Sequence, residues 1–317
     1  MNDATRWWTT GRALAALVMV ALAGATTTSA QVTELPGTTD LVDPDAEAPR
    51  ESTYETARGV GMGTGARASA QGTSALAYNP ANIGMGQLYH IETMAAFTRG
   101  DRAWMYGGGV VDSVTSKVAA GLAMHGFYGS GERALRGYDG RLALGLPLSP
   151  KIGLGVTARY MNLRSRLENE DGESVGASVK AFTLDAAVRV SPTDGLHIAL
   201  LGNNLIKTDS PLAPMLLGGS MAYSYGTVFS IGIDVMVDIT TFDGPELLIG
   251  GGIEYLAGES FPLRVGYRRD QGRELNQITA SVGYVDQQFG LDLAMRQDIA
   301  NGDNDTQFLL NLRYHVQ

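Results

Sequence analysis

After about Gln87, the chain alternates between apolar residues and polar or small ones. In the segment 151–161, every second position carries an apolar side chain: Ile152, Leu154, Val156, Ala158 and Tyr160. The same alternation recurs in later segments, among them those around Val265, Val282, Leu291 and Leu310. A period of two is that of a β-strand with one apolar face, and no useful stretch has the 3.6-residue period of an amphipathic helix. The pattern predicts an all-β fold over residues 87–317.

About fourteen such segments can be counted, centred near residues 92, 107, 122, 143, 157, 185, 200, 220, 233, 251, 265, 281, 293 and 311. Most are about 9 to 12 residues long, close to the roughly 9 to 11 that a tilted strand needs to cross a bilayer. Strands of soluble proteins are commonly shorter, about 5 to 6 residues. The lengths therefore favour a transmembrane antiparallel β-barrel of about 14 strands. A soluble antiparallel sandwich with its polar face in water is the alternative.

Charged residues of both signs lie on the non-apolar face in mid-strand, where a barrel presents them to its lumen: Arg141, Arg159, Asp185, Arg189, Asp234, Asp238, Glu254, Arg264, Arg268, Asp292, Arg296 and Arg313. A sandwich would expose the same residues to water, so the charges alone do not separate the two folds. Tyrosines on the apolar face near strand ends are typical of the aromatic girdle of a membrane barrel: Tyr160, Tyr255, Tyr267, Tyr284 and Tyr314. Their position favours the barrel, although a soluble core also accepts tyrosine.

The predicted connections alternate in length, which is independent information. One set is short: 112–115, 148–151, 191–195, 224–227, 257–261 and 285–288. The other set includes longer polar loops: 129–137, 164–178, 205–214 and 299–306. Short periplasmic turns and longer outer loops are typical of outer-membrane barrels. An even number of strands then places both ends of the barrel on the periplasmic side.

The N-terminal residues 1–30 have the pattern of a secretory signal peptide. Arg6 and Arg12 precede an apolar run, and small residues ending at Ala30 follow it, so cleavage is expected before Gln31. The run is shorter than the about 20 residues that a membrane-spanning helix needs, although a retained signal anchor is the alternative. Residues 31–58 are acidic and contain proline, and they are expected to form a flexible N-terminus.

Residues 59–86 are rich in Gly, Ala and Ser and contain Tyr78-Asn79-Pro80-Ala81 near their end. With Gly65-Ala66-Arg67-Ala68 before it, this segment resembles the N-terminus of the FadL and PorV families of outer-membrane proteins. In those families the segment folds as a small plug within a barrel of fourteen strands. The resemblance implies that Tyr78, Asn79, Pro80 and Ala81 belong to a plug, while a simple turn into the first strand is the alternative reading of Asn79-Pro80.

The resemblance also implies two functions. A FadL-like protein would be a plugged outer-membrane channel for the passive passage of a small hydrophobic solute. A PorV-like protein would be an anchor or an accessory that binds a secreted or surface protein, and the short chain favours this alternative somewhat. In both cases, the barrel is expected to be surrounded by outer-membrane lipid. In the channel, Arg264 and Arg268 would line the lumen with acidic residues of the two preceding predicted strands, Asp234, Asp238 and Glu254, and would tether the plug through salt bridges.

Composition excludes several other classes of protein. The 317 residues include 24 Lys or Arg against 33 Asp or Glu, a net charge of -9 that suits no nucleic acid partner. Because the chain has no cysteine, disulfides, cysteine-ligated metals and thiol catalysis are excluded. The four histidines have no metal-ligand spacing, and no Ser, His and acid arrangement is visible. No metal, cofactor or enzymatic activity is therefore expected, and a barrel enzyme of the outer-membrane phospholipase kind is disfavoured.

Overall fold

The computed structural model describes residues 54–87, 89–130, 135–165, 177–299 and 305–316. The predicted signal peptide at 1–30, and all but the last residues of the predicted flexible N-terminus at 31–58, lie outside them. None of the helices in these ranges is long and apolar enough to cross a membrane.

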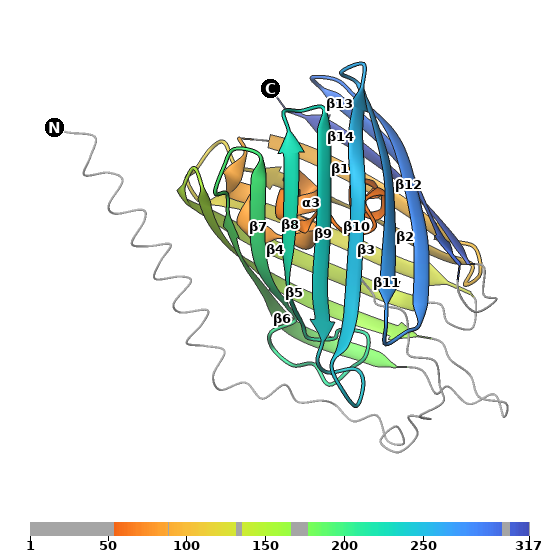
Figure 1. Ribbon diagram of the computed structural model, residues 1–317. Coiled ribbons are helices and arrows are strands. Elements are labelled where there is room, and N and C mark those ends of the chain that lie inside the picture. Colours follow the sequence, from red (N-terminus) through yellow and green to blue (C-terminus); the bar gives the residue numbers. More distant parts are fainter. Residues whose placement is uncertain (1–53, 88, 131–134, 166–176, 300–304, 317) are drawn as a thin grey trace, which may run out of the picture. The chain divides into compact units, whose positions relative to one another are not determined.

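Within the described ranges, fourteen antiparallel strands close into a barrel (Figure 1). Each strand pairs with its neighbours in sequence, and β1 completes the ring by pairing with β14. The strands are β1 (Tyr89–Thr98), β2 (Ala103–Asp112), β3 (Ala119–Gly129), β4 (Leu135–Ser149), β5 (Ile152–Ser165), β6 (Ser178–Val190), β7 (Leu196–Asn203), β8 (Leu216–Tyr225), β9 (Phe229–Asp238), β10 (Glu246–Ala257), β11 (Phe261–Asp270), β12 (Leu275–Val285), β13 (Phe289–Asp298) and β14 (Thr306–His315). The predicted all-β barrel is confirmed, and the sandwich alternative is wrong because the sheet closes on itself.

The two faces of the barrel wall have opposite character. Along β5, Val156 and Tyr160 face outward and are exposed, whereas Thr157 and Arg159 face inward and are buried. All five predicted girdle tyrosines are likewise exposed on the outer face: Tyr160, Tyr255, Tyr267, Tyr284 and Tyr314. A protein that exposes its large apolar side chains and buries its charges has the reverse of a water-soluble surface. The arrangement is that of a wall with hydrocarbon outside and a polar lumen inside.

The connections differ between the two ends of the barrel. At one end, the turn end, they are short, as at 150–151 and 258–260. At the other, the loop end, they include the longer loops 204–215 and 239–245. The predicted difference in loop length is confirmed there, while parts of three predicted loops, 131–134, 166–176 and 300–304, lie outside the described residues. Both β1 and β14 reach the turn end, where the Val316 amide donates to the Tyr89 carbonyl (2.8 Å).

The shortest pairing in the wall joins β6 to β7. It comprises five residue pairs, 186–190 with 198–202. Beyond them the loop 204–215 continues the wall, because the Asn204 amide donates to Oδ1 of Asp185 on β6 (2.7 Å). Asn204 has a φ of 52°, a left-handed conformation that asparagine tolerates better than most residues. The loop then turns inward and buries Leu212 beside Met161 and Leu163 of β5.

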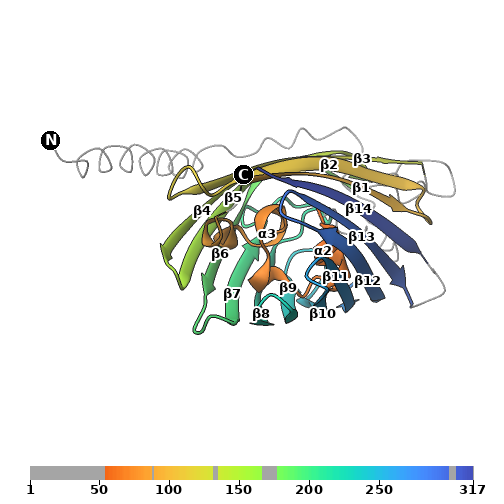
Figure 2. The ribbon, with the colours of Figure 1, turned by 90° about the horizontal axis from the view of Figure 1, so that it is seen from above.

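Residues 54–86 lie inside the ring of strands and are called the inner segment (Figure 2). The inner segment contains two short α-helices, α2 (Ala57–Gly61) and α3 (Gly72–Tyr78), and two 3₁₀ helices, η1 (Arg67–Ser69) and η2 (Pro80–Met85). It starts earlier than the boundary predicted at Gly59. Tyr54 and Ala57, assigned from the sequence to a flexible N-terminus, are 1% and 0% exposed.

The inner segment contacts every strand of the barrel. Helix α2 packs against β11–β14, η1 against β7–β9, α3 against β1–β3 and η2 against β3–β6, while Arg58 reaches Glu254 on β10. Glycine permits the closest of these contacts, since a Cβ added to Gly65 would stand 2.6 Å from the Cα of Gly251 on β10. The abundance of small residues in this segment therefore reflects backbone packed directly against the wall.

Candidate functional site

The contact between the inner segment and the lumen wall forms the candidate functional site. Asn79 organises the inner segment from within. Its side chain is buried, accepts from the Ala81 amide (3.1 Å) as the N-cap of η2, and donates from Nδ2 to the Arg67 carbonyl (2.9 Å). Pro80 occupies the first turn of η2, where its missing N–H leaves no hydrogen bond unmade. The Asn79-Pro80 pair therefore forms a turn, but this turn leads into η2 inside the barrel and not directly into the first strand. The Asn79 side chain also bonds η1 through the Arg67 carbonyl.

Tyr78 closes the same unit from the other side. Its hydroxyl accepts from the Thr56 amide (3.1 Å), and the Arg67 guanidinium lies 5.3 Å from its ring centroid. Gly59 allows the ring to approach, because a Cβ there would overlap the Tyr78 ring. Burial raises the pKa of Tyr78 well above the ordinary tyrosine value, so the hydroxyl stays neutral in the packed segment.

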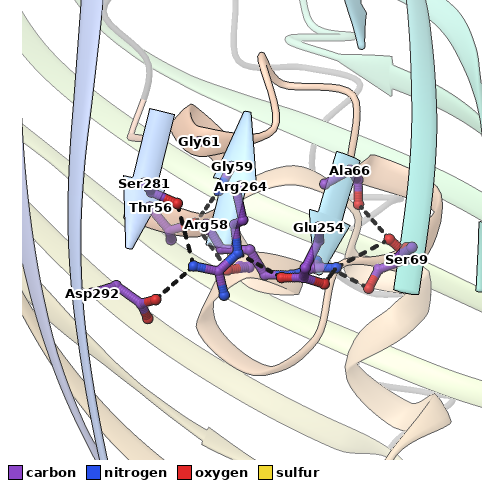
Figure 3. Close-up of polar contacts among 12 residues, drawn as sticks. Thr56, Arg58, Gly59, Gly61, Ala66, Ser69, Glu254, Arg264, Ser281 and Asp292 are labelled. Carbon is purple, nitrogen blue, oxygen red and sulfur yellow. Dashed lines mark hydrogen bonds and ion pairs between the residues drawn. The ribbon is translucent and has the colours of Figure 1, made fainter. Parts of the chain in front are cut away.

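A chain of ion pairs joins α2 to the wall (Figure 3). Arg58 donates through Nε and Nη2 to both carboxylate oxygens of Glu254 (3.0 and 2.9 Å). The same carboxylate accepts from Nε of Arg264 (2.5 Å), whose Nη1 donates to Asp292 (2.6 Å). Asp292 in turn accepts from Nη2 of Arg313 (2.5 Å). Charges therefore alternate from the inner segment across β10, β11, β13 and β14.

Two further ties use an acid and a base of the inner segment. Glu55 accepts from Arg296 on β13 (2.8 Å) and from Arg268 on β11 (3.3 Å). Arg67 forms an ion pair with Asp234 on β9 (3.2 Å), and both side chains are buried. A buried ion pair stabilises a contact only while both partners are present, since either one left alone is an uncompensated charge. These ties therefore hold the inner segment in one position.

A separate buried cluster lies on the opposite wall. Asp139 on β4 accepts from Arg141 (3.0 Å) and from Arg159 on β5 (2.7 Å). Arg141 also donates through Nη1 to the Ala77 carbonyl of α3 (3.0 Å), and so carries the cluster to the inner segment. Tyr54 stacks on His125 of β3, with ring centroids 3.7 Å apart.

The twelve charged residues predicted to line the lumen all face inward, and none is exposed. Of the five predicted to tether the inner segment, Asp234, Glu254 and Arg268 contact it directly. Arg264 acts through Glu254, whereas Asp238 lies at the loop end beside Arg273 (3.8 Å). Two of the remaining seven have local partners: Asp185 accepts from the Asn204 amide and Arg189 contacts His197 (2.8 Å).

Sequence reasoning missed the partners on the inner segment. Glu55 and Arg58 fall within 31–58, the range that its acidic and proline-containing sequence predicts to be a flexible N-terminus. Arg67 belongs to the Gly and Ala motif and is the only charged residue of 59–86, which is a usable signal. Asp139 was also missed, although it precedes Arg141 by two residues and therefore shares its face of β4.

Between the inner segment and the loop end, the lumen has an apolar side and a polar side. The apolar side comes from β1–β6: Met94, Met105, Phe127, Met161, Leu163 and Val179. The polar side comes from β11–β14: Arg268, Asp270, Gln277, Arg296, Asp298 and Gln307. A lumen filled only by water would have no need of the first set. The apolar side is closely packed, since Met161, Leu163 and Val179 are buried together with Leu212 of the loop 204–215.

Comparison with known proteins gives matches at the level of structure. No family model and no curated protein matches the chain. Among solved structures, the chain is similar to the toluene transporter TbuX of Ralstonia pickettii, with a TM-score of 0.60, 13% identity, and coverage of 84% of this chain and 100% of that one. It is also similar to a FadL homologue of Pseudomonas aeruginosa (TM-score 0.61, 11% identity, coverage 84% and 99%). The toluene transporter TodX of P. putida gives a TM-score of 0.56 at 12% identity, with coverage of 83% and 98%. The chain therefore has a FadL-like fold.

Proposed function

We propose that the protein is an outer-membrane channel in which the inner segment acts as a plug, and that a small hydrophobic solute crosses it passively. The observation that carries the proposal is the apolar side of the lumen, which ends on an inner segment that contacts all fourteen strands. Passage then requires the inner segment to move. The predicted signal peptide, the apolar exterior and the short turns at one end support the outer-membrane location. The similar structures named as toluene transporters support the class of solute.

A charge placed on the apolar side of the lumen tests this proposal. In Met161→Lys, an ammonium group would stand in the apolar cluster where Met161 is now fully buried with Leu163 and Leu212, so a solute path along this side would carry a charge. The matched control is Gln277→Lys on the polar side, where Asp298 already lies within hydrogen-bond distance. The assay is uptake of labelled toluene at low concentration by cells that display the protein. We expect toluene uptake by cells with the Met161→Lys variant to equal that of cells without the protein. Cells with the Gln277→Lys variant should retain uptake.

The second candidate is a barrel that never opens and serves as an anchor or a secretion accessory for a surface protein. The close backbone contacts between Gly65 and the wall favour this candidate, because they resist displacement. The same uptake assay separates the two, since an anchor would give no uptake above background in the unmodified protein. Co-purification of a secreted protein that depends on this chain would then support the accessory role.

A further inference from the structure

A strip of cations lies on the outer surface of the barrel at the loop end. Arg136 on β4, Arg164 on β5 and Lys180 on β6 occupy outward-facing positions of adjacent strands. Arg136 is directly opposite Arg164 in the register of β4 with β5. The next outward positions away from the loop end are Tyr138 on β4, Asn162 on β5 and Phe182 on β6, and Tyr160 follows Asn162 on β5. The strip therefore borders the apolar exterior of the wall.

The turn between β1 and β2 extends the strip. Arg99 and Arg102 line a hollow of about 700 Å³ whose remaining lining includes Phe97, Trp104 and Tyr128. Trp104 and Tyr128 are outward-facing neighbours in the register of β2 with β3. Arg136 joins the hollow to the rest of the strip, because its guanidinium lies 5.5 Å from the ring centroid of Tyr128. We call Arg99, Arg102, Arg136, Arg164 and Lys180 the cationic strip.

Among the described residues, the cations of the strip outnumber the acids near it. No Asp or Glu in the described parts of β1–β6 faces outward at the loop end, and the β1–β2 turn contributes one acid, Asp101, against two arginines. Like charges directly opposite each other on neighbouring strands disfavour a sheet, and Arg136 is opposite Arg164, although its Nε donates to the Gly129 carbonyl (2.9 Å). An anion bound at the strip would offset this accumulation of positive charge. Arginine forms paired hydrogen bonds with phosphate oxygens, which makes phosphate a well-matched anion.

We propose that the cationic strip binds the phosphate-bearing headgroup of a membrane lipid, with the acyl chains lying along the aromatic residues next to it. Aromatic side chains prefer the boundary between headgroups and hydrocarbon, and basic groups just beyond that boundary attract anionic headgroups. The inference rests on the membrane placement in the proposed function, but not on transport. It assigns the lipid to one sector of the wall, from the β1–β2 turn to β6.

Trp104 provides a direct probe of the site. The chain has three tryptophans, and Trp7 and Trp8 fall within the predicted signal peptide, so the processed protein keeps only Trp104 in the hollow. Purified processed protein in uncharged detergent is titrated with lipid A, a glycolipid with two phosphates, and Trp104 fluorescence is followed. The variant is Arg136→Gln with Arg164→Gln. The matched control is Arg269→Gln, which removes an outward-facing arginine at the loop end of β11 that bonds Asn276 (3.2 Å).

We expect saturable binding that the double variant weakens about 30-fold, since each basic group near the surface contributes about 1 kcal/mol to headgroup attraction. Arg269→Gln should bind as the unmodified protein does. In uncharged detergent without lipid, the double variant should resist heat better than the unmodified protein. Added lipid A should raise the heat resistance of the unmodified protein but not that of the double variant.

Several results would overturn the inference. They are equal affinities in the double variant and the unmodified protein, an equal loss in Arg269→Gln, equal binding of phosphatidylcholine, or full competition by inorganic phosphate at the concentration of the lipid. Toluene uptake by the double variant is measured in parallel and should be unchanged. If the unmodified protein binds lipid A but takes up no toluene, the channel is refuted and the lipid site is supported. If it takes up toluene but does not bind lipid A, the lipid site is refuted and the channel is supported.

Discussion

Glu254 connects the inner segment to the chain of ion pairs along the wall. Its carboxylate holds Arg58 by two hydrogen bonds and Arg264 by one. In Glu254→Gln, Arg264 keeps Asp292, but Arg58 loses its charged partner and one of the two acceptor oxygens, while its contacts with Ser69 remain. Hydrogen bonds to a charged group contribute about 1.5 to 3 kcal/mol. We therefore expect the displaced state of the inner segment to become about 10- to 100-fold more populated.

Single-channel recording in planar bilayers measures this population as the fraction of time that the barrel conducts ions. The matched control is Asp238→Asn, which removes an inward-facing acid of β9 that pairs with Arg273, a barrel residue near the loop end. The open fraction should rise in Glu254→Gln and stay low in Asp238→Asn. In a background with Arg58→Gln, Glu254→Gln should add little, because the ion pair is already broken. Equal open fractions in Glu254→Gln and the unmodified protein, or an equal rise in Asp238→Asn, would refute the reasoning.

Three further predictions concern the packing of the inner segment. Gly65→Val should destabilise it by about 1 to 3 kcal/mol through overpacking against Gly251, seen as trypsin cleavage after Arg67, whereas Gly244→Val, with open space around it, should not. Replacing Asn79, Pro80 and Ala81 by glycine should raise bilayer conductance, and unchanged conductance would argue against their role in the plug. Burial raises the pKa of Tyr78. The neutral hydroxyl therefore stabilises the packed inner segment fully below the ordinary tyrosine pKa of about 10. This stabilisation declines at higher pH, because Tyr78 loses its proton first when the inner segment is displaced. Conductance should accordingly rise above that pH in the unmodified protein and rise less in Tyr78→Phe.

The barrel could be predicted from the sequence because its physical signal is local. Along β5, the alternation of Val156 and Tyr160 with Thr157 and Arg159 records which side chains face hydrocarbon and which face the lumen. The strand number follows because each crossing repeats the same signal with a turn on either side. The alternation does not define where each strand ends. For example, β4 runs from Leu135 to Ser149 and includes an irregularity near Pro147.

Of the ion pairs between the inner segment and the wall, only the partner on the wall could be predicted from the sequence. Glu254 and Asp234 face the lumen by strand period, so their inward position follows from the sequence. Their partners Arg58 and Arg67 lie in short helical turns without any repeating pattern, and the pairings span 196 residues for Arg58 and 167 for Arg67. Nothing local in the sequence encodes a pairing over that distance. The Gly and Ala content signals close packing, but not which strand each residue approaches.

Deleting residues 54–86 tests the central claim, that the inner segment closes the lumen. The remaining barrel keeps its charged inner wall, so it should fill with water and conduct ions steadily in a planar bilayer, while the unmodified protein remains closed. Heat-modifiable migration on a denaturing gel establishes that the shortened chain has formed the barrel. A correctly folded barrel without these residues that conducts no better than the unmodified protein would contradict the account.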